Sequence, residues 1–199
     1  MIEATLFVDL DGTLTRTELL PAIARRAGLG DEMQELTDAT LSGQVPFDLS
    51  FRRRVDMLAG VSVETVHEEI LAAPVFEGLL SLLLEHPDRV VVVTGNLDVW
   101  IQPFLDRHGL RGVASIAEMQ GDRVIGVHSV LNESTALDLY PSAMSIAVGD
   151  GANDAAMVRR ADVGVAWCGV HAAARPLLEV ADYAFAGEES LCRFLRQWW

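Results

Sequence analysis

Carboxylate, hydroxyl and amide side chains gather in three short segments of this 199-residue chain, and each segment directly follows a run of apolar residues. The three segments are residues 9–13, 94–96 and 149–154. Taken singly, each would be an ordinary turn or helix cap, because Asp, Asn and Gly are common at both. In open α/β sheets, however, ligands bind outside the carboxyl ends of the strands. Three such segments in one chain therefore predict one shared site.

Four aspartates would meet at this site, namely Asp9, Asp11, Asp150 and Asp154. Two carboxylates about 4 Å apart repel each other by roughly 4 kcal/mol at an effective dielectric constant near 20. A divalent cation with oxygen ligands removes this repulsion, and Mg²⁺ is suited because it binds carboxylates together with water and phosphate oxygens. A calcium-binding EF-hand is excluded, because Leu14 stands where that loop requires glycine. The sequence therefore predicts a Mg²⁺ site that is open to a substrate.

The elements that would position these residues alternate between strand and helix. Short apolar or β-branched runs predict strands over residues 4–8, 90–93, 144–148, 162–166 and 182–185. Helical periodicity predicts helices over residues 75–85, 97–108, 133–139, 153–160 and 188–197. Strands that are apolar on both faces are typical of a parallel sheet covered by helices. The predicted fold class is therefore α/β, with a doubly wound, Rossmann-like core.

Residues 14–74 interrupt this alternation, because they show helical periodicity without a convincing strand. The segment is much longer than one crossover helix requires. We interpret it as an all-helical cap of three or four helices, inserted into an α/β core made of residues 1–13 and 75–199. Two further strand-like runs, over residues 115–119 and 123–127, flank Gln120-Gly121-Asp122 and predict a small β-hairpin.

Charge and composition narrow the possible partners. The chain has 15 lysine and arginine residues, all of them arginine, against 29 acidic residues, and its net charge is −14. Nucleic-acid binding is disfavoured, because it needs a basic face. The apolar runs stop short of membrane-spanning length, and residues 1–4 lack the basic start of a secretory signal. We expect a cytoplasmic protein without a membrane partner, and the sequence carries no sign of the oligomeric state.

Cysteine and histidine offer little chemistry by their spacing. Cys168 and Cys192 fit neither a disulfide framework nor a metal motif, so we expect buried thiols. The histidines are scattered singly, so neither a histidine metal site nor a catalytic triad is expected. They are His67, His86, His108, His128 and His171.

At its three motifs the chain resembles the haloacid dehalogenase superfamily of phosphohydrolases with an aspartate nucleophile. Asp9-Leu10-Asp11-Gly12-Thr13 is similar to the first family motif, and Thr94-Gly95 is similar to the second. Gly149-Asp150-Gly151-Ala152-Asn153-Asp154 is similar to the fourth and is typical of the phosphoserine-phosphatase branch. The resemblance extends over essentially the whole chain, including a cap between the first two motifs. It implies a Mg²⁺-dependent phosphatase that acts on a small phosphomonoester.

The resemblance also implies a role for each aspartate. Asp9 would be the nucleophile and would form an aspartyl phosphate, which divides one difficult step into two easier ones. Asp11 would protonate the leaving alkoxide and then activate water as a general base. The carboxylates of Asp9 and Asp150 and the backbone carbonyl of Asp11 would bind Mg²⁺, and Asp154 would orient these ligands.

Five further residues would bind the substrate. The Thr94 hydroxyl and the backbone amides of Gly95 and Asn96 would hold the phosphoryl oxygens. Glu18 and Arg54 coincide with the positions that bind an ammonium group and a carboxylate in the phosphoserine-phosphatase branch. Helical geometry supports Arg54, because it lies beside the apolar stripe of its predicted helix, whereas the two arginines before it turn toward solvent.

One residue that the family pattern requires is missing. The third family motif is a lysine that neutralises phosphate and nucleophile, and this chain contains no lysine. The helix pattern places Asn132 or Glu133 near that position. Either an arginine reaches in, with Arg123 and Arg54 as candidates, or the site works with less positive charge. The second case would lower catalytic efficiency, because such a group stabilises the transition state by several kcal/mol.

Several functions remain open at this point. Phosphoserine is the favoured substrate, because Glu18 and Arg54 occur together with the three motifs, and another small phosphorylated metabolite is the alternative. A phospho-accepting module that resembles a receiver domain is disfavoured, because such a module has no helical insertion and no counterpart of Asp11. A non-catalytic member that binds a phosphorylated ligand is supported only by the missing lysine.

Overall fold

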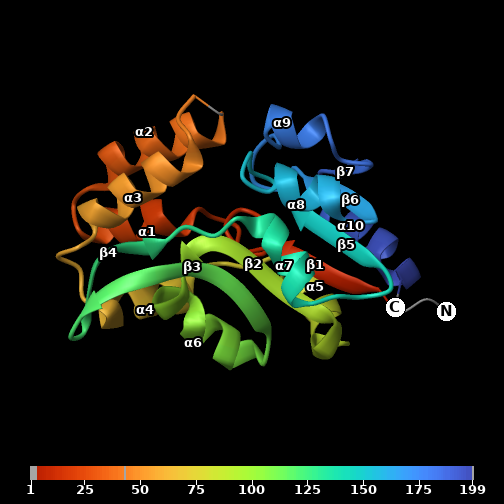
Figure 1. Ribbon diagram of the computed structural model, residues 1–199, viewed down its shortest axis with the longest axis horizontal. Coiled ribbons are helices and arrows are strands. Elements are labelled where there is room, and N and C mark those ends of the chain that lie inside the picture. Colours follow the sequence, from red (N-terminus) through yellow and green to blue (C-terminus); the bar gives the residue numbers. More distant parts are fainter. Residues whose placement is uncertain (1–3, 43, 199) are drawn as a thin grey trace.

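The computed structural model describes residues 4–42 and 44–198. Residues 1–3, which the sequence predicts to lack the basic start of a secretory signal, lie outside the described residues, as do residues 43 and 199. In the described part of the chain, a central sheet is covered by helices on both faces, and a group of helices stands at one side (Figure 1). This arrangement confirms the predicted α/β fold class.

The sheet of the described residues has seven strands in the order β4-β3-β2-β1-β5-β6-β7. Their bounds are β1 Thr5–Asp9, β2 Val90–Leu97, β3 Arg111–Gln120, β4 Arg123–Ser129, β5 Ser145–Gly149, β6 Val163–Trp167 and β7 Tyr183–Phe185. Neighbouring strands pair in parallel, except for the antiparallel pair of β3 and β4. Because β1 lies between β2 and β5, the carboxyl ends of these three strands are adjacent.

The predicted hairpin is part of this sheet rather than a separate unit. Its first strand begins earlier than predicted, because Arg111 already pairs with Val91 of β2. Gly112 allows this strand to lie close to α6, where an added Cβ would stand 2.6 Å from Cδ1 of Leu105. The sequence prediction missed this half of β3, because arginine and glycine interrupt its apolar pattern.

Two helical layers cover the sheet. The core helices are α5 Glu77–Leu83, α6 Asp98–His108, α7 Ala136–Leu139, α8 Ala155–Arg160, α9 Arg175–Leu178 and α10 Glu188–Leu195. Leu6 and Val8 of β1 pack with α5, α6 and α10 on one face, and Phe7 packs with α7, α8 and α9 on the other. The helix predicted over residues 133–139 is shorter than expected, because its start is a 3₁₀ turn, Glu133–Thr135. The sequence prediction missed α9.

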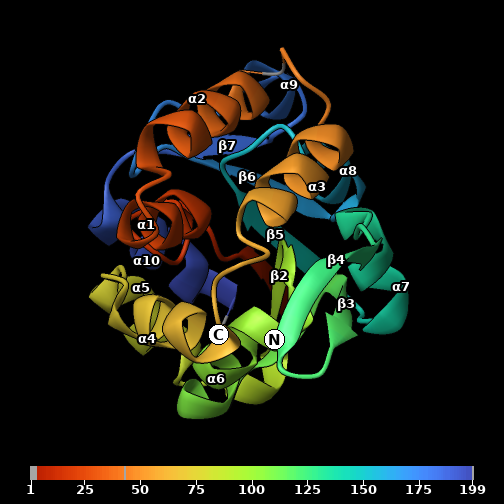
Figure 2. The ribbon, with the colours of Figure 1, turned by 90° about the vertical axis from the view of Figure 1, so that its left-hand side faces the viewer.

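The insertion between β1 and α5 contains four helices in the described residues, namely α1 Leu19–Arg26, α2 Gly30–Leu41, α3 Phe47–Met57 and α4 Val63–Ala72. The two ends of this insertion meet, because Thr15 and Val75 form an antiparallel bridge and the Arg16 amide donates to the Pro74 carbonyl at 2.7 Å. Figure 2 shows the insertion in front of the sheet, with α2 and α3 on one side and α4 near α6. The boundary of the cap at residues 14–74 stays a prediction.

Arg52 connects α3 to the hairpin. Its Nη1 donates to the carbonyl oxygen of Val127 on β4 at 2.6 Å. This corrects the expectation that Arg52 turns into solvent, because a helical wheel places a residue only relative to its own helix. Arg53 does point outward, with its side chain 66% exposed.

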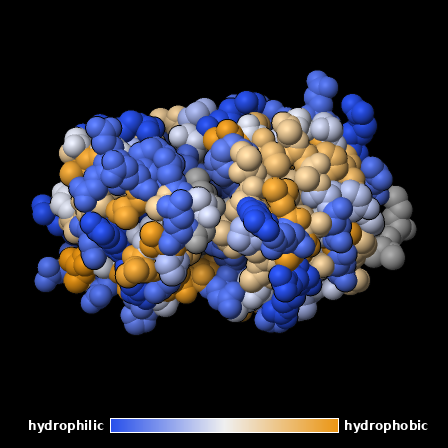
Figure 3. Space-filling model, turned by 90° about the horizontal axis from the view of Figure 1, so that it is seen from above, coloured by the Kyte–Doolittle hydropathy of each residue, from blue (hydrophilic) through white to orange (hydrophobic). Residues whose placement is uncertain are grey.

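The outer surface is mixed in character. The face seen from above in Figure 3 intersperses hydrophobic residues with hydrophilic ones. Within residues 4–42 and 44–198, every helix is too short or too polar to cross a bilayer.

Candidate active site

The carboxyl ends of β1, β2 and β5 bring the three predicted segments into contact. Thr13, which follows β1, donates from Oγ1 to Oδ1 of Asp150 at 3.1 Å. Thr94 at the end of β2 donates from Oγ1 to Oδ2 of Asp11 at 3.3 Å. One pocket of about 50 Å³ is lined by residues from all three segments together with Glu18 and Arg54. The three predicted segments therefore meet at one site, together with Glu18 and Arg54.

Asp11 is fixed by three hydrogen bonds. Its Oδ1 accepts from the backbone amide of Leu19 at 2.9 Å, and its Oδ2 accepts from Thr94 Oγ1 and from Asn96 Nδ2, each at 3.3 Å. Burial, followed by repulsion from Glu18, raises the pKa of Asp11 to about 6. A carboxyl with such a pKa is protonated often enough near neutral pH to act as a general acid.

Asp9 is almost fully buried and incompletely paired. Its side chain lies at the end of the central strand, and its Oδ2 has no hydrogen-bond partner. Burial is the main cause that raises the pKa of Asp9 well above its ordinary value, and repulsion from Asp154, Asp150 and Glu133 adds to it. An unpaired oxygen among other carboxylates is a favourable place for a cation.

The fourth-motif segment supplies the partner carboxylates. Oδ2 of Asp154 accepts from the backbone amides of Asp150 at 2.8 Å and Gly151 at 2.7 Å, and this fixes the turn after β5. Burial raises the pKa of Asp150 to about 7 and also raises that of Asp154. Asp9, Asp150 and Asp154 each place an oxygen within 4.8 Å of the others. This all-oxygen set fits a hard divalent cation such as Mg²⁺.

Glu133 occupies the region where the family pattern expects a lysine. Its side chain is buried, with a relative exposure of 2%, and its Oε1 accepts from Asn153 Nδ2 at 2.9 Å. Burial and repulsion from Asp154 raise the pKa of Glu133 well above its ordinary value. Asn132 points elsewhere, because its side chain accepts from the Ser134 amide and caps the turn. The position therefore carries a carboxyl group in place of an ammonium group.

Of the two arginines proposed as substitutes for lysine, Arg54 reaches the pocket. It is 5% exposed, donates from Nη1 to Thr37 Oγ1 at 3.3 Å, and has no partner for its Nε. Burial lowers the pKa of Arg54, while attraction to Glu18 and Asp11 opposes this effect. Arg123 is exposed on β4 and does not line the pocket.

The α3 helix covers the pocket through an aromatic side chain. Phe47 stacks on Phe51, and both rings line the pocket together with Gly95. An added Cβ at Gly95 would stand 2.2 Å from Cζ of Phe47. A side chain at position 95 would therefore displace the Phe47 ring from its place over the site.

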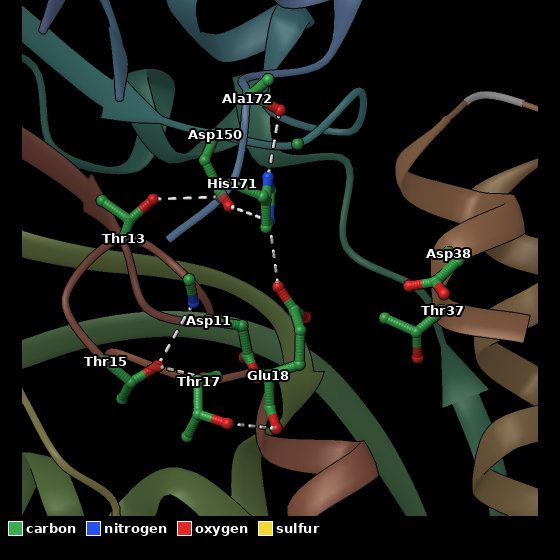
Figure 4. Close-up of polar contacts among 12 residues, drawn as sticks. Asp11, Thr13, Thr15, Thr17, Glu18, Thr37, Asp38, Asp150, His171 and Ala172 are labelled. Carbon is green, nitrogen blue, oxygen red and sulfur yellow. Dashed lines mark hydrogen bonds and ion pairs between the residues drawn. The ribbon is translucent and has the colours of Figure 1, made fainter. Parts of the chain in front are cut away.

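The sequence analysis missed His171 as a member of this site. Its Nε2 lies 2.9 Å from Oδ2 of Asp150 and 3.5 Å from Oε1 of Glu18 (Figure 4). These carboxylates raise the pKa of His171 to about 11, with Asp150 as the larger cause. His171 follows β6, which neighbours β5 in the sheet. Because ligands bind outside the carboxyl ends of the strands, this position in the sequence could have identified His171 as a site residue.

A family model and individual relatives of known function indicate the same protein family for this chain. Residues 6–159 match the family model of the haloacid dehalogenase-like hydrolases. The chain is 30% identical over 190 residues to the phosphoserine phosphatase of Methanocaldococcus jannaschii, covering 87% of this chain and 88% of that protein. It is 32% identical over 183 residues to the phosphoserine phosphatase of Halobacterium salinarum, covering 79% and 82%.

Solved structures agree with this result. A phospho-aspartyl intermediate analogue of a phosphoserine phosphatase superposes with a TM-score of 0.83 at 26% identity, covering 98% of this chain and 99% of that chain. A substrate-bound phosphoserine phosphatase also gives a TM-score of 0.83, at 25% identity, covering 99% and 98%. The likeness therefore includes both the sheet and the inserted helices.

We expect Glu133→Gln to stabilise the protein when divalent cations are removed with EDTA. The variant keeps an acceptor for Asn153 and removes one of several buried, mutually repelling carboxylates. Because the pKa of Glu133 is raised in the folded state, its ionisation reduces stability as the pH rises above the ordinary glutamate range. Glutamine does not titrate, so the gain should reach about 1–3 kcal/mol near pH 8 and shrink near pH 5.

Urea unfolding in EDTA at the two pH values measures this difference. Glu118→Gln, an exposed position on β3, is the matched control and should change stability little. A Glu133→Gln variant that is less stable than the wild type near pH 8 would contradict the electrostatic argument.

Proposed function

The chain belongs to the haloacid dehalogenase-like hydrolases, in their phosphoserine-phosphatase-like branch, and on that premise we propose that this phosphatase hydrolyses O-phospho-L-serine to L-serine and phosphate, with Mg²⁺ as cofactor and an aspartyl-phosphate intermediate. One observation carries the proposal. One pocket is lined by Asp9, whose Oδ2 is unpaired, by the buried side chain of Arg54 and by Glu18. A nucleophile, a carboxylate receptor and an ammonium receptor in one small cavity match the three functional groups of phosphoserine.

In the proposed reaction, Asp9 attacks phosphorus and Asp11 supplies the proton. The Asp9–phosphorus bond forms as the bond from phosphorus to the serine oxygen breaks, and Asp11 protonates the departing alkoxide. Asp11, now a carboxylate, removes a proton from water, and the water oxygen attacks phosphorus to release phosphate and restore Asp9. The hydrogen bonds from Leu19, Thr94 and Asn96 hold Asp11 in place for both steps.

The cation would be held by the carboxylates of Asp9 and Asp150 and by the backbone carbonyl of Asp11. The unpaired Oδ2 of Asp9 and the cluster of oxygens within 4.8 Å support this assignment. When bound, Mg²⁺ supplies positive charge that allows an anionic nucleophile and an anionic phosphate to approach each other. Asp154 orients the ligands, because it accepts the backbone amide of Asp150.

The phosphoryl oxygens would be held at the end of β2. The Thr94 hydroxyl faces Asp11, and Gly95, which lines the pocket beneath the Phe47 ring, would offer its backbone amide. The amide of Asn96 donates to Thr94 Oγ1 at 3.1 Å, so it orients this hydroxyl and would have to leave it in order to bind a phosphoryl oxygen.

Glu18 and Arg54 would select the organic part of the substrate. Arg54 has an unpaired Nε and a second nitrogen that contacts only a hydroxyl, so its guanidinium can turn to a carboxylate in a forked arrangement. Glu18 would bind the ammonium group. A phosphorylated hydroxy acid without an ammonium group is the second candidate substrate, because His171 lies 3.5 Å from Oε1 of Glu18 and competes for this carboxylate.

The substrate is tested with three phosphomonoesters of similar size. Phosphoserine carries both charged groups, phosphoethanolamine lacks the carboxylate, and phospholactate lacks the ammonium group. We expect kcat/KM to be highest for phosphoserine in the presence of Mg²⁺. In Arg54→Gln the advantage of phosphoserine over phosphoethanolamine should fall about 10- to 100-fold, the value of a charge-assisted hydrogen bond.

Arg53→Gln is the control for this series, since Arg53 is exposed on the same helix. A higher kcat/KM for phospholactate than for phosphoserine would favour the second candidate. Equal rates for all three esters would exclude both assignments of Arg54 and Glu18.

The covalent intermediate is tested with variants of the two aspartates. Asp9→Asn should abolish turnover. Asp11→Asn should still accept a phosphoryl group from an aryl phosphate, whose leaving group needs no protonation, and should lose it slowly because no base activates water. Intact-protein mass spectrometry should therefore detect a phosphorylated protein for Asp11→Asn. It should detect none for the double variant that carries both Asp9→Asn and Asp11→Asn. Turnover by Asp9→Asn at the wild-type rate would refute the nucleophile assignment.

The charge reversal at Glu133 predicts a gain of function. Glu133→Lys restores the ammonium group that the family pattern places beside nucleophile and phosphate. We expect kcat/KM to rise by about tenfold or more, because a fixed positive charge stabilises the transition state. Glu133→Gln separates the loss of a negative charge from the gain of a positive one. A Glu133→Lys variant that is slower than Glu133→Gln would show that this position does not contact the reacting groups.

A further inference from the structure

A second group of ligand atoms lies beside the proposed Mg²⁺ cluster. Glu18 comes from the segment after β1, Asp150 from the end of β5, and His171 from the loop after β6 (Figure 4). The ligand atoms of these three side chains lie within 4.8 Å of one another. This group differs from the cluster of Asp9, Asp150 and Asp154, because it includes a nitrogen atom.

The three ligand atoms are close together but poorly paired. Oδ2 of Asp150, Oε1 of Glu18 and Nε2 of His171 are all buried, and none makes a well-directed hydrogen bond. Nε2 nevertheless lies only 2.9 Å from Oδ2 and 3.5 Å from Oε1. The side chain of Asp150 is 4% exposed, so water does not compensate for the missing bond. Either an ion pair with a protonated His171 or a cation shared by all three ligand atoms would satisfy this carboxylate.

The other ring nitrogen of His171 favours the same conclusion. Nδ1 lies 3.1 Å from the carbonyl oxygen of Ala172, and an Nδ1–H that donates to this oxygen leaves the lone pair of Nε2 free. Histidines that bind metals commonly hold their second nitrogen in this way, which fixes the ring and the tautomer. The loop is itself fixed to the site, because the amide of Ala174 donates to the carbonyl of Asp150 at 2.9 Å.

Glycine keeps the space beside these oxygens open. An added Cβ at Gly12 would stand 2.4 Å from Oδ2 of Asp150 and 2.9 Å from Oε1 of Glu18. Gly12 also has a φ of +76°, which favours glycine over other residues. A side chain at this position would press on two of the three ligand atoms.

We propose that, in the substrate-free protein, Glu18, Asp150 and His171 bind a divalent first-row transition-metal ion through Oε1, Oδ2 and Nε2. An imidazole nitrogen combined with carboxylate oxygens suits Mn²⁺ or Zn²⁺, whereas Mg²⁺ prefers oxygen ligands alone. A surface pocket lined by Thr17 and Gln34 adjoins His171, and it provides a route for the ion from solvent. Asp150 belongs to both clusters, so its carboxylate connects this ion to the proposed Mg²⁺ position.

A protonated histidine is the competing explanation. Two carboxylates raise the pKa of His171 to about 11, so the imidazolium would supply one positive charge against two negative ones. A divalent ion supplies two charges and three directed bonds, and it satisfies all three unpaired atoms. The two explanations differ in one measurable property, which is a direct bond from a metal ion to the histidine nitrogen.

Mn²⁺ alone is the probe, added to the full chain without substrate. Its unpaired electrons detect a directly bound nitrogen by electron spin echo envelope modulation. We expect nitrogen modulation in the wild type, a change of its frequency when histidine is labelled with ¹⁵N, and its loss in His171→Asn. His128→Asn, an exposed position on β4, should keep the modulation. Glu18→Gln should keep it as well but raise the Kd of the nitrogen-coupled ion about tenfold or more.

Two results would overturn the proposal. The first is Mn²⁺ bound to the wild type with oxygen ligands only, which needs no variant and is independent of how His171→Asn folds. The second is nitrogen modulation that persists in a folded His171→Asn. No substrate is present in this experiment, so a negative result would not contradict the proposed phosphatase reaction. A negative result for the phosphatase reaction would likewise not change the outcome expected here.

Discussion

The balance of buried negative charge governs this site. Burial is the main cause that raises the pKa of Asp9, Glu133 and Asp154, and repulsion from Asp154 raises the pKa of Asp9 and Glu133 further. Carboxylates in such surroundings need a proton, a hydrogen-bond donor or a cation. The chain contains no lysine, and the arginine that lines the pocket, Arg54, is proposed to bind the carboxylate of the substrate. Its chemistry is therefore tied to the cations that it can bind.

The sheet enforces this crowding of charge. Because β1 lies between β2 and β5, the residues at their carboxyl ends stand about one strand spacing apart, roughly 5 Å. The strands that hold them are apolar and buried on both faces, and burial of each large aliphatic side chain contributes about 1.5–3 kcal/mol. Many such side chains offset the repulsion among a few carboxylates. The acidic residues therefore cannot separate without loss of the packing that holds the strands.

The sequence predicted the features that depend on periodicity and on strand ends, and it missed those that depend on contacts between elements. Buried parallel strands are apolar along their whole length, so their positions and the polar segments after them were readable. The sequence left both Asn132 and Glu133 as candidates for the position of the family lysine, because Glu133 begins a 3₁₀ turn that is too short to define a face. His171 lies in a loop without periodicity, and Arg52 gains its partner from a strand that no helical wheel includes. Tertiary packing decided all three cases.

Substrate binding makes the demand for positive charge larger. A phosphate monoester brings up to two further negative charges into a pocket that already contains Asp9 and Glu18. In the proposed function, Arg54 meets the carboxylate of the substrate, so it would not balance the phosphoryl group as well. The phosphoryl charge must therefore be balanced at the ends of β1 and β5, where Asp150 connects the two clusters of ligand atoms. A cation bound by Asp150 lowers the repulsion on both sides of this carboxylate, and it can replace the charge that a lysine would otherwise supply.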